Sequence, residues 1–354
     1  MMRRRKSCTI HDVARLAQVS VATVSALTNS SAFVSEALAE RIRNAMAVLD
    51  YHPDRVARSL RTGKTHAIGM VVPDVTNPFY PEVIRGVEQA AQQNGYSLVL
   101  VNSNENPEQE RSGLETLMAL RVDGLLIACC DGAATTYDVL ARRNIPTVFV
   151  DRIPAQASTI RVATDNFKAG LVATKHLIDL GHKRIAIVAG RMELSPHAAR
   201  VEGFRKAMQE AGLAVLDDYF RTGSLSVESG YRMGKKLLAL ECRPTAIFCT
   251  NNKSLLGLVR AVGEQKIACP AELSVIGFDD FAWTENFHPQ LTTIVQSAQE
   301  LGRRGTGILI ERIMMRDGTH PTEPIPAEPL LIEAQLQIRQ STAPPPGSAT
   351  PRTP

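Results

Sequence analysis

From Ala67 onward, short continuous apolar runs alternate with amphipathic segments of helical period, which leaves few folds open to this chain. The apolar runs cover residues 68–72, 97–101, 124–128, 147–150, 184–188, 246–249 and 273–278. The helical segments cover residues 79–94, 107–120, 133–143, 167–180, 197–211, 227–240 and 253–265. Strands that are apolar on both sides belong to parallel sheets covered by helices on both faces. The pattern predicts an α/β fold, and its two sets of elements predict two similar lobes with a cleft between them.

The first 50 residues follow a different pattern, typical of three short helices. The first helix, capped by Thr9, is expected to bury one face: Ile10, Val13, Leu16 and Ala17. A second helix is expected to begin at Val21 with Ser20 as its cap, and a third to cover 35–49. Two helices joined by a short turn and braced by a third form the helix-turn-helix layout.

The outer face of the second helix argues against a simpler interpretation, in which the three helices pack only to form a core. Such packing would require the same apolar spacing. That interpretation does not explain why small and polar residues gather on this face: Ser20, Ala22, Thr23, Ser25 and Ala26.

Basic charge is concentrated at the N-terminus. The whole chain has a net charge of +4, whereas residues 1–65 hold 11 Lys/Arg and 5 Asp/Glu, a net charge of +6. This distribution is expected when one small module contacts a polyanion and the rest has another task. The alternative is a solvated basic segment without a partner.

Two segments are expected to lie outside the folded parts. Residues 55–64 follow a break at 51–54 and are too short and basic to form a stable helix alone, so they would become helical when a partner supports them. The last 14 residues contain five prolines and are predicted to be disordered. The predicted boundaries are 1–52 for the headpiece, 53–65 for the linker, 66–340 for the body and 341–354 for the tail. Within the body, the first lobe would comprise about 66–162 plus 294–325, and the second about 163–293 plus 326–340.

Motifs for catalysis and metal binding are missing from the sequence. There is no GxxxxGK[ST], no GxGxxG after a strand, no GxSxG and no HExxH, and His182 is interpreted as a turn residue. The six cysteines lack CxxC spacing and are predicted to be reduced thiols of a cytoplasmic protein. No apolar run has the length of a membrane span, and the basic start lacks the apolar stretch of a secretory signal. We therefore expect no enzyme, cofactor, metal site or membrane partner.

Residues 9–25 (TIHDVARLAQVSVATVS) resemble the headpiece of the LacI/GalR family of bacterial transcription regulators. Segments similar to the family follow in family order across about residues 9–335. They are 51–53 (YHP), 57–60 (ARSL), 73–79 (PDVTNPF), 164–166 (TDN), 180–186 (LGHKRIA), 200–204 (RVEGF), 275–280 (VIGFDD) and 289–294 (PQLTTI).

This resemblance implies that the second helix enters the major groove of DNA and that the linker reaches the minor groove. The implied DNA contacts are Thr9, Ser20, Val21, Ala22, Thr23, Ser25, Asn29, Tyr51, Arg55, Ala57, Arg58 and Leu60. Leu60 matches a leucine that family members insert at a central CG step, and the alternative is that it packs the linker onto the body. Ala26 stands where the family usually has an arginine, so the operator is expected to differ from the common one.

The body resembles the periplasmic sugar-binding fold, which holds its ligand between two lobes. The implied effector contacts are Asn77, Phe79, Asp151, Arg200, Asn251 and Asp279. An arginine and carboxylates facing one cleft suit the donors and acceptors of a sugar. The alternative for Arg200 and Asp279 is a salt bridge between the lobes, and Asp165 and Asn166 could instead cap a helix.

Two departures from the family pattern concern the ligand. Leu225 replaces a stacking aromatic residue, and Asn252 stands where an aspartate is usual. A stacking ring could come from elsewhere: Phe79, Trp283 or Phe287. The additional cations Arg152 and Lys253 leave room for an acidic or phosphorylated sugar.

The sequence as a whole therefore predicts a regulator, expected to be a repressor, that binds a pseudo-palindromic operator as a homodimer under the control of a sugar-like effector. One rival is a solute-binding protein of the same body fold, which leaves residues 1–65 unexplained. The other is an α/β enzyme, for which the sequence offers no catalytic constellation.

Overall fold

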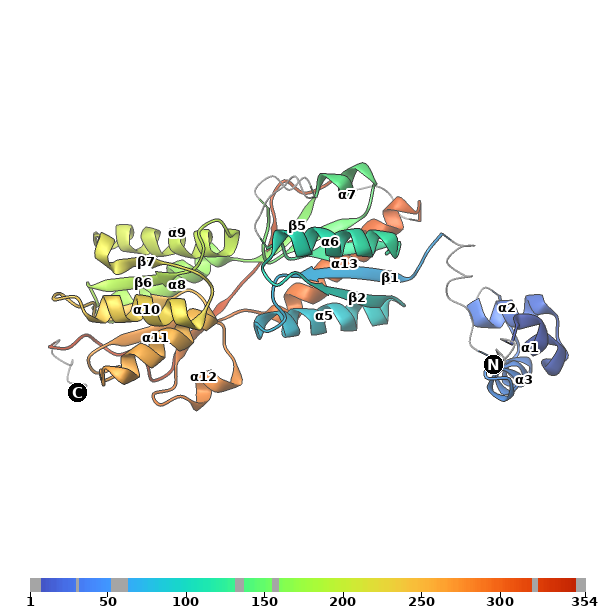
Figure 1. Ribbon diagram of the computed structural model, residues 1–354, viewed down its shortest axis with the longest axis horizontal. Coiled ribbons are helices and arrows are strands. Elements are labelled where there is room, and N and C mark those ends of the chain that lie inside the picture. Colours follow the sequence, from blue (N-terminus) through green and yellow to red (C-terminus); the bar gives the residue numbers. More distant parts are fainter. Residues whose placement is uncertain are drawn as a thin grey trace, which may run out of the picture. The chain divides into compact units, whose positions relative to one another are not determined.

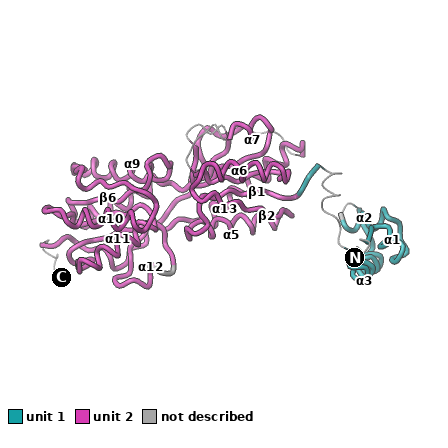
Figure 2. Tube along the Cα trace, viewed as in Figure 1, with its two compact units in different colours: residues 1–65 teal, residues 66–354 magenta. Residues whose placement is uncertain are grey.

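The computed structural model describes residues 8–29, 32–51, 63–130, 137–154, 159–319 and 324–347, without the side chains of Asn29, Ala282 and Trp283. The chain divides into two compact units, Met1–Thr65 and His66–Pro354 (Figure 2). Each unit has its own hydrophobic core, and the two are described separately below.

The described part of the first unit forms three helices, as predicted: α1 (Ile10–Ala17), α2 (Val21–Asn29) and α3 (Glu36–Val48). Their shared core is made of small and branched residues: Val13, Ala14, Ala17, Val24, Ile42 and Ala45. Both predicted caps are confirmed. Thr9 donates its N–H and its hydroxyl to the Asp12 carboxylate at 3.0 and 2.7 Å, and Ser20 Oγ accepts the Thr23 N–H at 3.1 Å.

One prediction about this core is wrong. Leu16 is 50% exposed, and Ala14 is buried instead. At 3.6 residues per turn, Ala17 and Ala14 lie about 40° and 100° from Val13 on one side of the helix, whereas Leu16 lies about 60° from Val13 on the other side.

The first lobe of the second unit is built on a six-stranded parallel sheet in the order β11-β5-β4-β3-β1-β2. Figure 1 labels three strands of this lobe, β1, β2 and β5. Its strands are β1 (Ala67–Val72), β2 (Ser97–Asn102), β3 (Gly124–Ile127), β4 (Thr147–Val150), β5 (Ile160–Thr164) and β11 (Leu330–Ile332). The covering helices are α5 (Phe79–Gln93), α6 (Pro107–Ala119), α7 (Asp138–Arg142) and α13 (Ala298–Arg316). Helices α5 and α13 bury one face of the sheet, and α6 and α7 bury the other.

The second lobe repeats this plan around a sheet in the order β12-β10-β9-β8-β6-β7, in which only the edge strand β12 is antiparallel among the described strands. Its strands are β6 (Ile185–Ala189), β7 (Phe220–Thr222), β8 (Ala246–Cys249), β9 (Ser274–Phe278), β10 (Thr292–Val295) and β12 (Gln335–Gln337). Its helices are α8 (Asn166–Asp179), α9 (Ser195–Glu210), α10 (Val227–Leu238), α11 (Asn252–Glu264), the short α12 (Ala282–Asn286) and the 3-10 turn η2 (Asp217–Tyr219). Helices α8 and α9 cover one face, and α10 and α11 cover the other. The predicted two-lobed α/β fold is confirmed.

Helices α8 and α9 approach each other through glycine. A Cβ placed on Gly203 would lie 2.1 Å from the Phe167 carbonyl oxygen, and one on Gly170 would lie 2.2 Å from the Arg200 carbonyl oxygen. No side chain larger than hydrogen fits at either position without a shift of backbone. This close approach fixes α9, the helix that carries Arg200.

The chain passes between the lobes after β5, after β10 and after β11. The expected boundary near 326 is wrong, because β11 still pairs with β5 in the first sheet and the second lobe resumes only at β12. The expected boundaries near 162 and 294 fall inside β5 and β10. A strand must reach the end of its sheet before the chain can leave the lobe, so the crossings lie later than predicted.

The predicted disorder of residues 341–354 is wrong for the part that the structure describes, 341–347. Ser341 is fully buried in the second lobe. Its Oγ donates to the Val275 carbonyl at 2.6 Å and accepts the Thr292 N–H at 2.8 Å. Its own carbonyl accepts the Val275 N–H at 2.8 Å. These bonds keep the segment ordered despite its proline-rich composition, because they satisfy backbone groups that would otherwise be buried without partners.

Candidate DNA-binding surface and interlobe site

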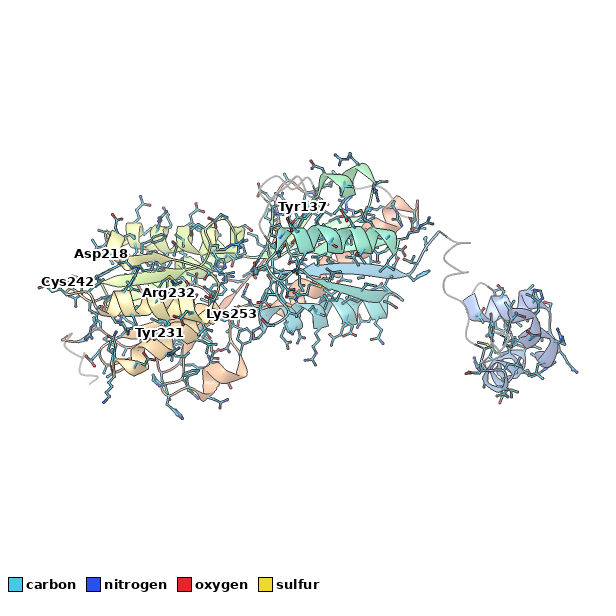
Figure 3. All side chains as sticks on the ribbon, viewed as in Figure 1. Tyr137, Asp218, Tyr231, Arg232, Cys242 and Lys253 are labelled. Carbon is cyan, nitrogen blue, oxygen red and sulfur yellow. The ribbon has the colours of Figure 1, made fainter. Side chains whose placement is uncertain are left out.

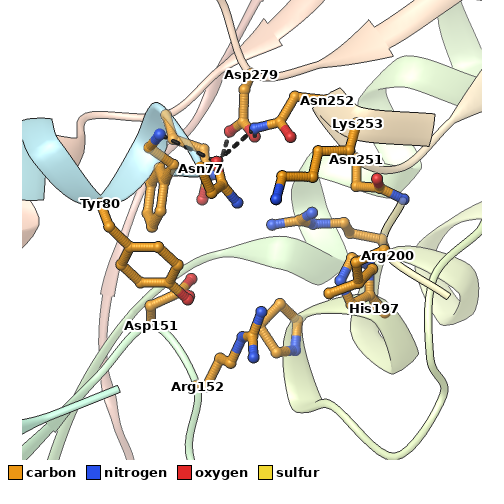
Figure 4. Close-up of a pocket in the computed structure, with 14 residues that line it drawn as sticks. Asn77, Tyr80, Asp151, Arg152, His197, Arg200, Asn251, Asn252, Lys253 and Asp279 are labelled. Carbon is orange, nitrogen blue, oxygen red and sulfur yellow. Dashed lines mark hydrogen bonds between the residues drawn. The ribbon is translucent and has the colours of Figure 1, made fainter. Parts of the chain in front are cut away.

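The cleft residues follow the carboxyl ends of the parallel strands, where ligands of open α/β sheets bind. Asn77 and Phe79 follow β1, and Asp151 follows β4, in the first lobe. Asn251 and Asp279 follow β8 and β9 in the second lobe. Because both sheets end at the interlobe region, side chains from distant parts of the sequence meet there (Figure 4).

The structure brings all six expected effector residues to one cavity of about 40 Å³. The other residues that line it are Tyr80, Arg152, Pro196, His197, Leu225, Asn252, Lys253 and Gln296. Sequence reasoning missed Tyr80, Pro196, His197 and Gln296. Tyr80 directly follows the segment 73–79, and Pro196 and His197 lie at the start of the expected helix 197–211, but no sequence pattern marked any of the four as a cleft residue.

The wall from the first lobe carries a buried carboxylate with one protein donor. Asp151 Oδ2 accepts the Tyr80 hydroxyl at 2.9 Å. Burial raises the pKa of Asp151 above its usual value, and the nearby Arg152 and Arg200 guanidinium groups oppose that shift. Arg152 is itself held by Glu105 through two hydrogen bonds of 2.8 Å. Its charge is therefore neutralised within the first lobe.

The wall from the second lobe is organised by Arg200. Its Nε donates to Asn166 Oδ1 at 2.7 Å, and its Nη1 donates to the Thr250 carbonyl at 2.6 Å. The guanidinium carbon lies 3.4 Å from the centre of the Phe278 ring, a cation–π geometry. Burial lowers the pKa of Arg200 to about 10, so the side chain remains charged at neutral pH.

Asp279 is the second buried carboxylate. Its Oδ2 accepts from Asn252 Nδ2 at 2.8 Å, and its Oδ1 accepts from Gln296 Nε2 at 2.5 Å. Burial raises its pKa, and Arg200 opposes the shift. No ion pair joins Arg200 to Asp279 in the described part of the chain, so the alternative of an interlobe salt bridge between them is wrong.

Direct contacts already connect the lobes across this cavity. Asn252 Nδ2 donates to Asn77 Oδ1 at 2.8 Å. Lys253 pairs with Asp74 and donates to Thr76 Oγ1 at 3.3 Å, and its position in the second lobe next to the first is visible in Figure 3. Both additional cations, Arg152 and Lys253, therefore have carboxylate partners.

Two buried polar atoms in the cavity wall have no hydrogen-bond partner. They are His197 Nδ1 and Asn251 Nδ2. The other amide atom of Asn251 caps α11 by accepting the Ser254 N–H at 2.9 Å, which fixes the orientation of the side chain. Burial and three nearby arginines hold the pKa of His197 well below its usual value, so its ring is neutral. Unpartnered buried polar atoms are uncommon in folded proteins and mark places where a ligand or water can bind.

Other residues singled out from the sequence have structural roles. Asp165 caps α8 by accepting the Lys168 N–H at 2.9 Å, which confirms the capping alternative for it. His182 contacts Thr245 Oγ1 at 2.9 Å and the Ala343 carbonyl at 2.8 Å, away from the cleft. Phe287 packs in the core of the second lobe instead of the cavity, and the Trp283 side chain lies outside the described residues.

In the first unit, the expected DNA contacts divide into a group that the structure describes and a group that it does not. Five of the first group lie on or beside α2, where Ser20 and Ala22 are exposed and Val21, Thr23 and Ser25 are partly buried. Tyr51 packs against the three-helix core, and Thr9 lies at the start of α1. The second group lies outside the described residues: Arg55, Ala57, Arg58, Leu60 and the side chain of Asn29.

No metal or membrane element is found in the part of the chain that the structure describes. Its His, Cys, Asp and Glu side chains form no group of three that could hold an ion. None of its helices combines the length and apolarity needed to cross a bilayer. All six cysteines are free thiols.

Comparisons with known proteins cover both units. The family model "Bacterial regulatory proteins, lacI family" matches residues 9–54, and "Periplasmic binding proteins and sugar binding domain of LacI family" matches residues 65–334. The chain is 38% identical over 334 residues to the HTH-type transcriptional repressor PurR of Histophilus somni (strain 2336), across 94% of this chain and 98% of that protein. It is 39% identical over 329 residues to the ribose operon repressor of Escherichia coli (strain K12), across 92% of this chain and 98% of that protein.

The solved structures agree with these relatives. The lac repressor dimer bound to operator and the anti-inducer ONPF has a TM-score of 0.83 with this chain at 28% identity, across 96% of this chain and 100% of that one. A LacI family regulator from Enterococcus faecium with bound ribose has a TM-score of 0.68 at 29% identity, across 78% of this chain and 99% of that one. The curated relatives are transcriptional repressors and not enzymes. The chain belongs to the LacI family of DNA-binding bacterial transcription regulators.

Proposed function

We propose that this regulator acts in the cytoplasm as a repressor. It binds a pseudo-palindromic operator as a homodimer and is controlled by a neutral sugar or sugar derivative held between the lobes of the body. The observation that carries the effector proposal is the cavity that Asn77, Asp151, Arg200, Asn251 and Asp279 line from both lobes. A ligand there contacts both lobes and therefore favours one arrangement of them over another.

The chemistry of the cavity favours hydroxyl groups. Asp151 and Asp279 are acceptors with lone pairs to spare, and Asn251 Nδ2 is a donor without a partner. A sugar hydroxyl can donate to a carboxylate and accept from an amide at the same time. A polyol therefore satisfies this set of groups better than an acceptor-only anion does.

The charge of the cavity favours a neutral ligand. The two cations that left room for an acidic sugar are already paired, Arg152 with Glu105 and Lys253 with Asp74. The charge of Arg200, the third cation in the cavity wall, is offset by the neighbouring carboxylates Asp279 and Asp151. A carboxylate or phosphate on the ligand would therefore have to displace a protein carboxylate from Arg152 or Lys253, or lie close to Asp151 and Asp279. Leaving a buried carboxylate unpaired is costly, so the acidic sugar is the less favoured ligand.

The DNA part of the proposal rests on the headpiece. The exposed start of α2, with Ser20 and Ala22, is a surface of small residues that lets the helix approach the major groove closely. The lac repressor dimer bound to operator, which matches 96% of this chain, supports the dimeric state. Two headpieces related by a two-fold axis require two half-sites, and hence a pseudo-palindrome.

The test is a fluorescence anisotropy titration of an operator fragment with the purified protein, in the presence of neutral sugars, sugar acids or sugar phosphates. We expect a neutral sugar to change operator affinity by about tenfold, within the usual range of allosteric coupling. Asp279→Asn should abolish that change while leaving affinity for DNA alone intact. Asp218→Asn, at an exposed residue of η2, is the matched control and should behave as the wild type. A response to anionic sugars only, or an undiminished response in Asp279→Asn, contradicts the proposal.

A further inference from the structure

His197 is a residue of the cavity wall to which the proposed function gives no task. Its side chain lines the cavity from the second lobe and is only 5% exposed. The groups assigned so far to ligand hydroxyls are the carboxylates of Asp151 and Asp279 and the amide of Asn251. A histidine ring both donates and accepts hydrogen bonds, so a buried ring in a ligand cavity is suited to recognising a polar group.

Packing, rather than polar contacts, sets the position of this ring. His197 lies in the first turn of α9, three residues before Arg200. Residues at this spacing share one face of a helix, so both side chains lie at the cavity (Figure 4). The residue after β6 is Gly190, and a Cβ placed on it would lie 2.8 Å from His197 Nδ1. The absence of a side chain at Gly190 therefore leaves the space that the ring occupies.

The ring nitrogens of His197 have no hydrogen-bond partner among the residues that the structure describes, and Nδ1 is fully buried. Two other histidines of the second lobe show the contrast. His176 Nε2 lies 3.0 Å from Thr342 Oγ1, and His182 Nδ1 lies 2.9 Å from Thr245 Oγ1. Those two rings hold protein segments together through their nitrogens. The ring of His197 does not, so its nitrogens are left for a ligand.

The charge state of the ring favours a hydroxyl group as its partner. Burial and the nearby Arg200, Arg152 and Arg191 hold the pKa of His197 well below its usual value, so the imidazole is neutral. A neutral imidazole has one donor nitrogen and one acceptor nitrogen. A hydroxyl group can accept from the first or donate to the second, so it pairs with whichever nitrogen it meets. A hydrogen atom in place of that hydroxyl pairs with neither.

We propose that His197 is a specificity-determining residue of the cavity, which binds one particular hydroxyl group of the effector and rejects sugars that lack it. This inference rests on the proposed function, and it adds the residue that selects among neutral sugars. A ligand without the matching hydroxyl leaves the ring nitrogens of His197 buried and unpaired, which weakens its binding.

The test is isothermal titration calorimetry on the full-length protein with D-ribose, D-xylose, D-glucose and D-galactose, followed by the monodeoxy analogues of the sugar that binds most tightly. In the wild type, at least one analogue should bind about tenfold more weakly than its parent sugar. His197→Leu should weaken binding of the parent about tenfold and bring its ratio to that one analogue close to one. The ratios for the other analogues should stay unchanged, because such a cycle isolates the contact between one side chain and one hydroxyl.

Two further substitutions separate hydrogen bonding from shape. His197→Phe keeps a ring but has no nitrogen, so it should reproduce the result of His197→Leu. His197→Gln supplies an amide that donates and accepts, so it should restore part of the lost ratio. The matched control is His11→Leu, at an exposed histidine of α1 in the other unit, which should bind every sugar as the wild type does.

Thermal unfolding without ligand distinguishes recognition from a structural role. His197→Leu removes a buried polar group that has no partner, so its melting temperature should equal or exceed that of the wild type. A lower melting temperature together with an equal loss of affinity for every sugar would show that the ring only shapes the cavity, and would overturn the inference.

The remaining outcomes separate this inference from the proposed function. If a neutral sugar binds the wild type but His197→Leu and His197→Phe leave every ratio unchanged, the role of His197 is refuted and the sugar effector stands. If none of the four sugars binds the wild type, the neutral sugar effector is contradicted, and the assignment of His197 fails with it.

Discussion

Replacing Ser341 with alanine should destabilise the second lobe by about 2–4 kcal/mol, although this residue lies in a segment whose composition predicts disorder. Its hydroxyl donates to the Val275 carbonyl at 2.6 Å and accepts the Thr292 N–H at 2.8 Å, with no exposure to solvent. Losing two hydrogen bonds costs about 1 kcal/mol each, and leaving the Thr292 N–H buried without a partner costs about 1–3 kcal/mol, part of which overlaps with the lost bonds.

The assay is urea unfolding followed by tryptophan fluorescence. The chain has a single tryptophan, Trp283, which lies in α12 of the second lobe, so the signal reports on that lobe. With a urea dependence of about 2–3 kcal/mol per molar, the midpoint should fall by about 1 M. Ser112→Ala, at an exposed position of α6 in the first lobe, is the control and should shift it by less than about 0.3 M. An equally small shift in Ser341→Ala would refute the packing of this segment against β9 and β10.

Three further predictions concern the body. Burial raises the pKa of Asp279, so the penalty on its charged form grows as pH rises from the unfolded value through the folded one, and Asp279→Asn should lose part of the resulting decline in melting temperature between pH 3 and pH 7. Burial lowers the pKa of His182, so stability should fall as pH drops below about 6.5, and in urea titrations at pH 7 and 5 His182→Gln should lose part of that dependence. Gly203→Ala places a methyl group 2.1 Å from the Phe167 carbonyl oxygen, so it should lower the melting temperature by several degrees and weaken effector binding through displacement of α9, whereas Gly263→Ala, which meets no neighbour, should do neither.

The sequence predicts those parts of the fold that depend on local pattern. Buried strands such as β1 and β8 are continuous apolar runs, and helices such as α10 have a clear apolar face, so both were predicted near their observed ends. The three-residue edge strands β7, β11 and β12 are partly exposed and too short to show such a pattern, and β7 and β12 are also mixed in polarity. Their existence depends on pairing with strands far away in the sequence, and this is why the boundary near 326 was misplaced.

The residues of the candidate site also divide into those that could be predicted from the sequence and those that could not. The six residues taken from the family resemblance meet at one cavity because the carboxyl ends of parallel strands converge there. Gln296 joins them only because the crossing after β10 passes beside Asp279. His197 joins them because it lies in the first turn of α9, which packs closely on α8 and begins at the cavity. Neither cause is visible in a local sequence pattern.

The pairing of the two additional cations was also beyond the sequence. Arg152 and Lys253 alone suggest an anionic ligand, but their partners Glu105 and Asp74 reach them from other loops. The sequence gives the number of charges, whereas the charge available to a ligand depends on which of them are already paired. This difference favours a neutral sugar over the acidic or phosphorylated one for which the two cations had left room.

The central claim, that the protein reads a two-fold operator through its headpieces, is tested most directly by selecting bound duplexes from a random DNA pool at two salt concentrations. The account predicts a pseudo-palindrome with a central CG step, bound with an affinity that falls steeply as salt rises. It also predicts half-sites unlike the common family sequence, since Ala26 replaces the usual arginine. If no palindromic sequence is enriched, either with the protein alone or with neutral sugars present, the account of this chain as an operator-binding repressor is contradicted.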